Sequence, residues 1–118
     1  MFSHEKLDVY QCSLEFLAFA MTIINNLGAN LNELKSQFQR ASLSIPLNIA
    51  EGVGRTGEKD QCRFYAIARG SAFECAAILD ACKIISPKTP VDMSAGKQLQ
   101  VRIIAMLTKM CKPNFNGL

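Results

Sequence analysis

The chain has 118 residues, a formal net charge of +3 and 49% hydrophobic residues. This length fits one domain over residues 1–118, and the hydrophobic content excludes a disordered chain. So mild a charge does not mark a dedicated nucleic-acid binder, because such proteins concentrate basic residues more strongly. The longest apolar stretch, 16–21, is too short to span a membrane and the start lacks a signal-peptide pattern, so we expect a cytoplasmic protein.

Residues 5–27 are predicted to form the first helix, because apolar residues recur there at spacings of three and four. The stripe expected to face the core consists of Leu7, Tyr10, Leu14, Leu17, Met21 and Ile24. A second apolar stripe lies beside it and consists of Val9, Cys12, Phe16, Phe19 and Ile23. Together they are wider than a small bundle needs, so the second stripe is either a generously buried face or a contact between subunits.

Residues 32–53 predict a second helix, with Asn32 as its N-cap. Its expected inner face consists of Leu34, Phe38, Ala41, Ile45 and Ile49. Pro46 lies inside this pattern, where it removes a backbone donor and crowds the preceding turn. Because the apolar register continues past Pro46, we expect a kink there and not a helix end.

A third helix is predicted over residues 58–85, capped by Thr56 or Gly57. Small residues crowd its middle, and they would let a neighbouring backbone approach closely. Gly70 lies among them. A glycine inside a helix costs ~1 kcal/mol relative to alanine, so we expect Gly70 to have a packing reason.

The last helix is expected to begin at Asp92 or Ser94 and to end near Cys111, before Pro113. Its expected inner face consists of Leu99, Ile103, Met106 and Met110, and its flanking apolar set of Val101, Ile104, Ala105 and Leu107. Short connections make sequential helices antiparallel neighbours. The sequence therefore predicts an all-α, antiparallel up-down-up-down four-helix bundle.

The five cysteines show no pattern of a disulfide framework or a zinc site. They are Cys12, Cys62, Cys75, Cys82 and Cys111. Their number is odd, no Cys-x-x-Cys occurs, and most have apolar neighbours, as small buried side chains do. We therefore expect reduced cysteines that bind no metal, in a reducing compartment.

The sequence contains few side chains or motifs that could act in catalysis. His4 is the only histidine, and no Glu-x-x-His pair of the kind that builds di-iron sites in helical bundles occurs. The glycines Gly52 and Gly54 follow no predicted strand, so they read as a helix end and not as a phosphate loop. We expect a protein that is not an enzyme and that needs no cofactor.

Polar residues interrupt the second and third helices at regular spacing. They are Arg40, Ser44, Asn48, Glu51, Arg63, Ser71 and Glu74. If the helices turn near residues 55–56, antiparallel register places Arg40 opposite Ser71 and Glu74, and Glu51 opposite Arg63. We favour a structural network with Arg40 paired to Glu74, because a buried charge must be paired. A ligand or partner site is the alternative.

Basic residues gather near the predicted turn, at Arg55, Lys59, Arg63 and Arg69. In a monomer this cluster is unremarkable. In a ring of subunits it would repeat and form a larger positive surface, and added charges raise phosphate affinity steeply. These four residues are therefore candidates for binding nucleic acid.

Two segments carry a family resemblance that extends over essentially the whole chain. QFQRASLSIPLNIAEG (37–52) and RFYAIARGSAFE (63–74) closely resemble the signatures of four-helix bundle proteins encoded in intervening sequences of 23S ribosomal RNA genes. The chain departs from that pattern at Gly57, where a capping serine is expected. More distantly, it resembles the accessory protein of diversity-generating retroelements, a basic pentamer that binds a reverse transcriptase and nucleic acid.

The resemblance implies a four-helix bundle that assembles into a homopentamer. With the second apolar stripe, it makes Phe16, Phe19 and Ile104 the candidate contacts between subunits. Two functions follow. The first is a non-enzymatic oligomeric scaffold that binds protein partners. The alternative is an accessory module that binds structured RNA or DNA.

Overall fold

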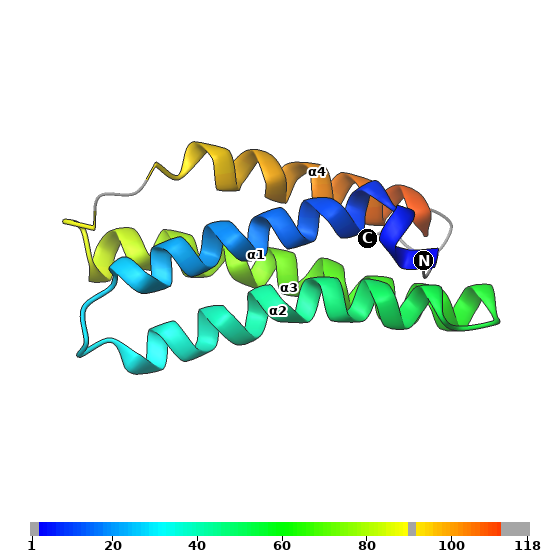
Figure 1. Ribbon diagram of the computed structural model, residues 1–118, viewed down its shortest axis with the longest axis horizontal. Helices are drawn as coiled ribbons and strands as arrows, with labels where there is room; N and C mark the ends of the chain where they lie inside the picture. Colours follow the sequence, from blue (N-terminus) through cyan, green and yellow to red (C-terminus); the bar gives the residue numbers. More distant parts are fainter. Residues whose placement is uncertain (1–2, 90–91, 112–118) are drawn as a thin grey trace.

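Four α-helices make up the computed structural model, which describes residues 3–89 and 92–111 (Figure 1). A short 3-10 helix, Ser3–Lys6, comes first, and the four helices are α1 (Asp8–Asn26), α2 (Asn32–Val53), α3 (Glu58–Ile85) and α4 (Ser94–Met110). No strand occurs within the described ranges, in agreement with the predicted all-α class. The boundary expected at Pro113 lies outside the described residues.

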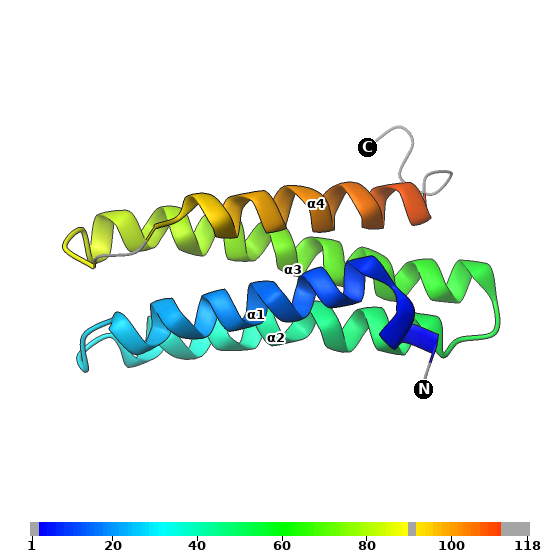
Figure 2. The ribbon, with the colours of Figure 1, turned by 45° about the horizontal axis from the view of Figure 1, so that its top comes forward.

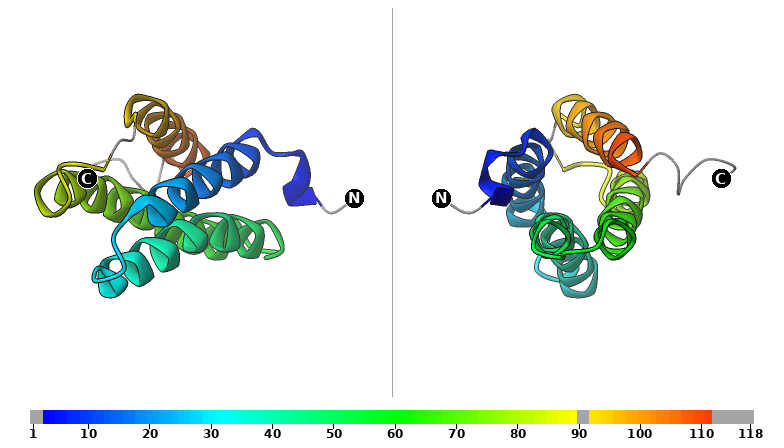
Figure 3. Two further views of the ribbon diagram at one scale, coloured as in Figure 1. Left: turned by 60° about the vertical axis from the view of Figure 1, so that its left-hand side comes forward. Right: turned by 90° about the vertical axis from the view of Figure 1, so that its right-hand side faces the viewer.

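Each helix runs antiparallel to the one before it, and α4 returns to lie beside α1 (Figures 1 and 2). Seen along the bundle, the four helices surround one core (Figure 3). Both α1 and α3 contact α2 and α4. This arrangement confirms the predicted up-down-up-down topology.

The inward face of α1 is built mainly on the second apolar stripe, so the generously buried face is the alternative that the structure shows. Phe16 and Ile23 are fully buried, and Cys12 is nearly so. Leu14, which was expected in the core, is 37% exposed, and Leu17 is half-buried. The predicted core stripe was therefore wrong at Leu14 and Leu17, although its Ile24 is buried as expected. Periodicity defines the width of an apolar face and not the part of it that meets the neighbouring helices.

The inner face of α2 follows the sequence prediction. Phe38, Ile45 and Ile49 are fully buried. Pro46 is buried too, and the helix continues through it to Val53. The packing on both sides of Pro46 therefore outweighs the loss of one backbone hydrogen bond. The kink itself stays a prediction.

The helices α2 and α3 start at the predicted residues, whereas α1 starts at Asp8, three residues after the predicted start. Gly57 is the N-cap of α3, as one of the two predicted options. Asp92 precedes α4 and accepts hydrogen bonds from the amide and the hydroxyl of Ser94, at 2.9 and 2.7 Å, which lower the pKa of the Asp92 carboxyl. The predicted cap of α2 was wrong by one position, because Leu31 is the N-cap and Asn32 the first helical residue.

The helices α1 and α4 pack tightly at Gly96. A Cβ atom built there would overlap the ring of Phe19, so only glycine fits this position without a shift. Farther along α4, Ile103 and Leu107 are fully buried, while Met110 is partly exposed. Ile103 was predicted for the core. Leu107 was assigned to the flanking set instead, and Met110 was expected inside.

Candidate interaction surface

A chain of hydrogen bonds joins α2 to α3 at half-buried positions. The Ser71 hydroxyl donates to the Ser44 hydroxyl at 2.9 Å. The Asn48 side-chain amide donates to the carbonyl and the hydroxyl of Ser44, at 2.8 and 3.0 Å. These three predicted network residues therefore do come together, and they hold two helices in register at their outer junction.

The predicted ion pair between Arg40 and Glu74 is not formed. Both side chains are exposed, and Glu74 instead accepts a hydrogen bond from Gln37 at 3.3 Å. The antiparallel register brought Arg40 and Glu74 to similar heights along the bundle. It could not show that both point outward, away from the core, where water solvates each charge and no partner is needed.

Glu51 and Arg63 also have other partners than predicted. Arg55 lies 3.0 Å from Glu51 and 3.7 Å from Asp60, and Arg63 lies 3.1 Å from Asp60. The guanidinium groups of Arg55 and Arg63 both lie over the ring of Phe64, at 4.6 and 4.3 Å from its centroid. This local network around the α2–α3 turn forms in place of the predicted Glu51–Arg63 pair. Charged side chains contact partners a few positions away in sequence more readily than partners on another helix.

The four candidate nucleic-acid residues do not form one positive surface. Residues 51–63 carry three acidic and three basic side chains, so their charges balance. Lys59 is exposed within this segment. Arg69 lies on another side of α3, where it donates to the Thr108 hydroxyl at 2.8 Å and lies over the Phe73 ring at 5.1 Å.

The outer face of the α2–α3 pair carries exposed aliphatic side chains beside the serine–asparagine network. Leu47 is 58% exposed and Ile67 is 43% exposed. Leu43, one helical turn from Leu47, lines a groove with Ile24 of α1 instead. Gly70, one turn from Ile67, is exposed, and a Cβ built there would meet nothing within 4 Å. The close packing expected at Gly70 is therefore absent within this bundle. We call this surface the α2–α3 face: Leu47, Ile67 and Gly70.

The three candidate contacts between subunits lie elsewhere. Phe16 is fully buried and packs against Phe38 of α2, with ring centroids 6.4 Å apart. Phe19 packs on Gly96, and Ile104 is half-buried against the core. The wide apolar face of α1 is thus used inside the bundle, because α2 and α4 cover it from two sides. Phe16 is not available to a second copy.

One disulfide contradicts the prediction that all cysteines are reduced. Cys62 and Cys111 are bonded, with Cα atoms 5.7 Å apart and a sequence separation of 49. No local sequence motif predicts this pair, because the two cysteines meet only through the antiparallel packing of α3 and α4. Cys12, Cys75 and Cys82 are free and buried. Burial raises the pKa of all three thiols, and that of Cys75 to about 12, with a smaller contribution from Glu74.

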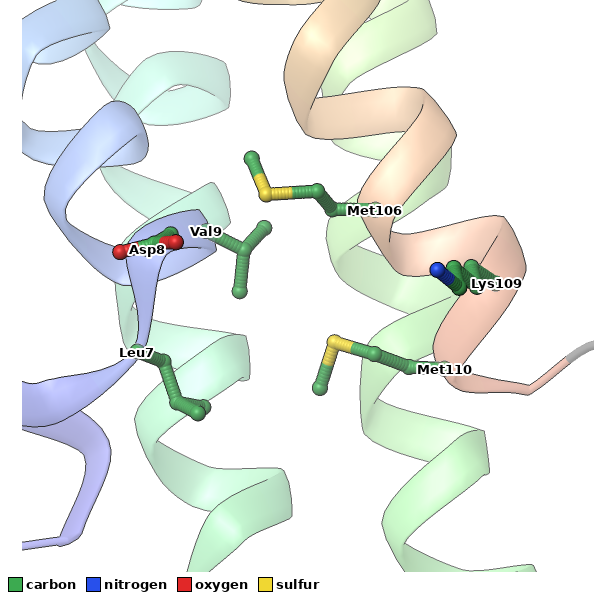
Figure 4. Close-up of a pocket in the computed structure, with 6 residues that line it drawn as sticks. All are labelled: Leu7, Asp8, Val9, Met106, Lys109 and Met110. Carbon is green, nitrogen blue, oxygen red and sulfur yellow. The ribbon is translucent and has the colours of Figure 1, made fainter.

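A cavity of about 300 Å³ opens between the start of α1 and the end of α4 (Figure 4). Leu7, Val9, Met106 and Met110 give it an apolar lining. In Figure 4 the two methionine side chains extend from α4 toward Val9 and Leu7. The residues Asp8 and Lys109 complete the lining. Sequence reasoning missed this cavity, although the spacing of the two methionines places them on one side of α4.

The described residues bring together no group of three or more histidine, cysteine or acidic side chains that could hold a metal ion. His4 packs edge-on against Tyr10, with ring centroids 4.7 Å apart. Among the described helices, none combines the length and the apolar character needed to cross a membrane.

A comparison with known protein families gives one match. The family described as 23S rRNA-intervening sequence protein matches residues 5–109, which include both signature segments and nearly all of the four helices. The chain has no significant match among curated proteins.

Proposed function

Because this chain belongs to the family of 23S rRNA-intervening sequence proteins, we propose that it is a non-enzymatic scaffold that assembles with copies of itself and binds a protein partner. The α2–α3 face is the surface that carries the assembly, and a homopentamer is its expected form. The observation behind this proposal is the exposure of Leu47 on α2 and of Ile67 on α3, together with a helical glycine, Gly70, at which a Cβ would meet nothing within 4 Å.

Two exposed aliphatic side chains are not unusual on their own, since single apolar residues are common on protein surfaces. Here Leu47 lies one helical turn from Ser44 and Ile67 one turn from Ser71, and these two half-buried serines are hydrogen-bonded to each other. Exposed apolar side chains beside polar groups are typical of protein–protein contacts. Its position on two rigid, hydrogen-bonded helices means that little order must be gained on binding.

Gly70 supports a close contact at the same place. Glycine in a helix costs ~1 kcal/mol relative to alanine, and no neighbour within the bundle requires it. A second helix that packs against α3 from outside would supply the reason, because a missing side chain lets two backbones approach. Ala66 and Ala77 are also exposed, and their small side chains extend the area against which such a helix could pack closely.

The alternative, an accessory module that binds structured RNA or DNA, finds less support. Arg55 and Arg63 each have acidic neighbours within 4 Å, and Arg69 faces a different helix pair. Phosphate binding would have to displace those carboxylates, which weakens the attraction that a basic cluster otherwise provides.

The mass of the assembly tests the proposal. Light scattering should find the wild-type protein as a multiple of its 13.0 kDa chain, five chains being expected. Leu47→Glu and Ile67→Glu should each yield a folded monomer, because a carboxylate cannot be buried against an apolar partner. Val101→Glu is the matched control, since Val101 is 68% exposed on α4 and should leave the mass unchanged.

Two outcomes would count against self-assembly through this face. One is a wild-type species of 13.0 kDa at micromolar concentration. The other is an unchanged mass in both glutamate variants. RNA and DNA binding measured across a salt series addresses the alternative separately, because counterion release gives a steep salt slope when several phosphates are contacted. Tight binding with a steep slope would favour the accessory module.

A further inference from the structure

The Cys62–Cys111 disulfide joins two helix ends at one end of the bundle. Cys62 lies near the start of α3, and Cys111 directly follows the last residue of α4. The chain connection between these helices lies at the opposite end (Figure 2). We propose that this bond is a redox-sensitive latch that holds the end of α4 against α3 and that a small thiol such as glutathione can open.

The last turn of α4 depends on this attachment. Leu107 is fully buried, and Thr108 accepts the hydrogen bond from Arg69. Beyond them, Lys109 and Met110 are exposed, whereas Cys111 is 1% exposed and bonded to Cys62 of α3. Terminal helical turns fray readily when nothing fixes them. Opening the bond should therefore release residues 109–111 and leave the earlier part of α4, Leu107 and Thr108 included, packed.

Thiol–disulfide exchange supplies the chemistry. A glutathione thiolate attacks the Cys62 sulfur, the less buried of the two, forming a mixed disulfide while the Cys62–Cys111 bond breaks. Cys111 leaves as a thiolate and takes up a proton. A second glutathione thiolate then attacks the glutathione sulfur of the mixed disulfide, releasing Cys62 as a thiolate that is also protonated. The protein gains two electrons and two protons, and the two glutathiones leave as one glutathione disulfide; oxidation is the reverse.

The other three cysteines leave the latch undisturbed. Cys12, Cys75 and Cys82 are buried among core side chains on the bundle's interior. Their raised pKa values keep them as thiols, and a thiol is a poor nucleophile compared with a thiolate. The pair therefore switches between two defined states without exchanging with a neighbouring cysteine.

The latch controls the cavity between α1 and α4. Met106 and Met110 form its α4 wall, and Met110 lies next to Cys111. With the bond closed, this wall is held in place from the α3 side. Once the bond opens, Met110 can move with the fraying turn, so the cavity widens toward solvent at the end of the bundle.

Hydrogen exchange followed by mass spectrometry compares the two states in the wild-type chain, so the test needs no variant to fold. Reduction should speed exchange at residues 109–111 by tenfold or more and leave α2 unchanged. Cys62→Ser/Cys111→Ser should exchange like the reduced form with or without reductant. Cys12→Ala, which keeps the bond, should respond like the wild type. Equal exchange in the oxidised and reduced forms would overturn the latch.

A titration in mixtures of glutathione and glutathione disulfide, with peptide mapping after acid quenching, tests reversibility. The latch requires that the Cys62–Cys111 peptide pair appears at the oxidising end and disappears at the reducing end. A bond that survives the largest excess of glutathione would be a permanent crosslink. A bond that never forms would leave two ordinary buried thiols. Either result would refute the proposal.

Discussion

The Ser71 hydroxyl lies 2.9 Å from the Ser44 hydroxyl and donates a hydrogen bond to it across the junction of α2 and α3. A double-mutant cycle with Ser44→Ala and Ser71→Ala should give a coupling energy of about 0.5–1.5 kcal/mol in chemical denaturation. The control cycle, Arg40→Met with Glu74→Gln, should give a coupling near zero, because those two side chains are solvated and unpaired with each other. A larger coupling in the control cycle would show that the ion pair forms after all.

Two glycines inside helices should respond to alanine in opposite directions. Gly96→Ala should destabilise the bundle by about 1–3 kcal/mol, because the new methyl group overlaps the Phe19 ring. Gly70→Ala should stabilise the isolated bundle by up to ~1 kcal/mol, since nothing lies near the added atom. Thermal unfolding measures both, and Phe19→Leu in the Gly96→Ala background should restore part of the loss. Equal effects at both sites would contradict the packing described for Gly96.

Loss of the disulfide should lower stability through the unfolded chain. Cys62→Ser/Cys111→Ser should reduce the free energy of unfolding by about 2–4 kcal/mol, because the bond closes a loop with a sequence separation of 49. The wild-type protein unfolded with reductant present should show the same loss. If the two serine substitutions lower the free energy of unfolding as much in reductant as without it, the loss would come from core packing and not from the crosslink.

The buried Cys75 thiol should make stability fall at alkaline pH. Its pKa is raised from 9.0 to about 12 in the folded protein, so the unfolded chain releases the proton first as the pH rises. The contribution of this thiol is fully present below pH 9 and is lost between about pH 9 and pH 12. Relative to Cys75→Ala, which cannot titrate, the wild type should lose about 1 kcal/mol between pH 9 and pH 10. Parallel pH profiles for the two proteins would rule out this burial effect.

The helices and their order could be predicted from sequence because each depends on local patterns. Apolar spacing defined α2 and its inner residues, such as Phe38 and Ile45. The orientation of α1 could not be predicted in the same way. Its two apolar stripes are adjacent, and the choice between them depends on where α2 and α4 lie, which no local pattern encodes.

Within the candidate site, only the contacts between short, uncharged side chains could be predicted from the sequence. Ser44, Asn48 and Ser71 were identified because regular polar positions on two antiparallel helices must meet at some junction. The partners of Glu51 and Arg63 were missed, because long charged side chains reach several neighbours and solvent competes for all of them. The disulfide was missed because its cysteines meet only through the packing of α3 and α4.

The cavity between α1 and α4 brings together residues from near the two ends of the described chain, since Val9 and Met106 both line it. Bringing them together requires closing almost the whole chain into a loop, whereas α2 and α3 meet across a short turn. We therefore expect an α2–α3 hairpin to form early in folding and the contact between α1 and α4 to form last. Pulsed hydrogen exchange during refolding should protect α2 and α3 amides before those of α4, and simultaneous protection of all four helices would exclude this order.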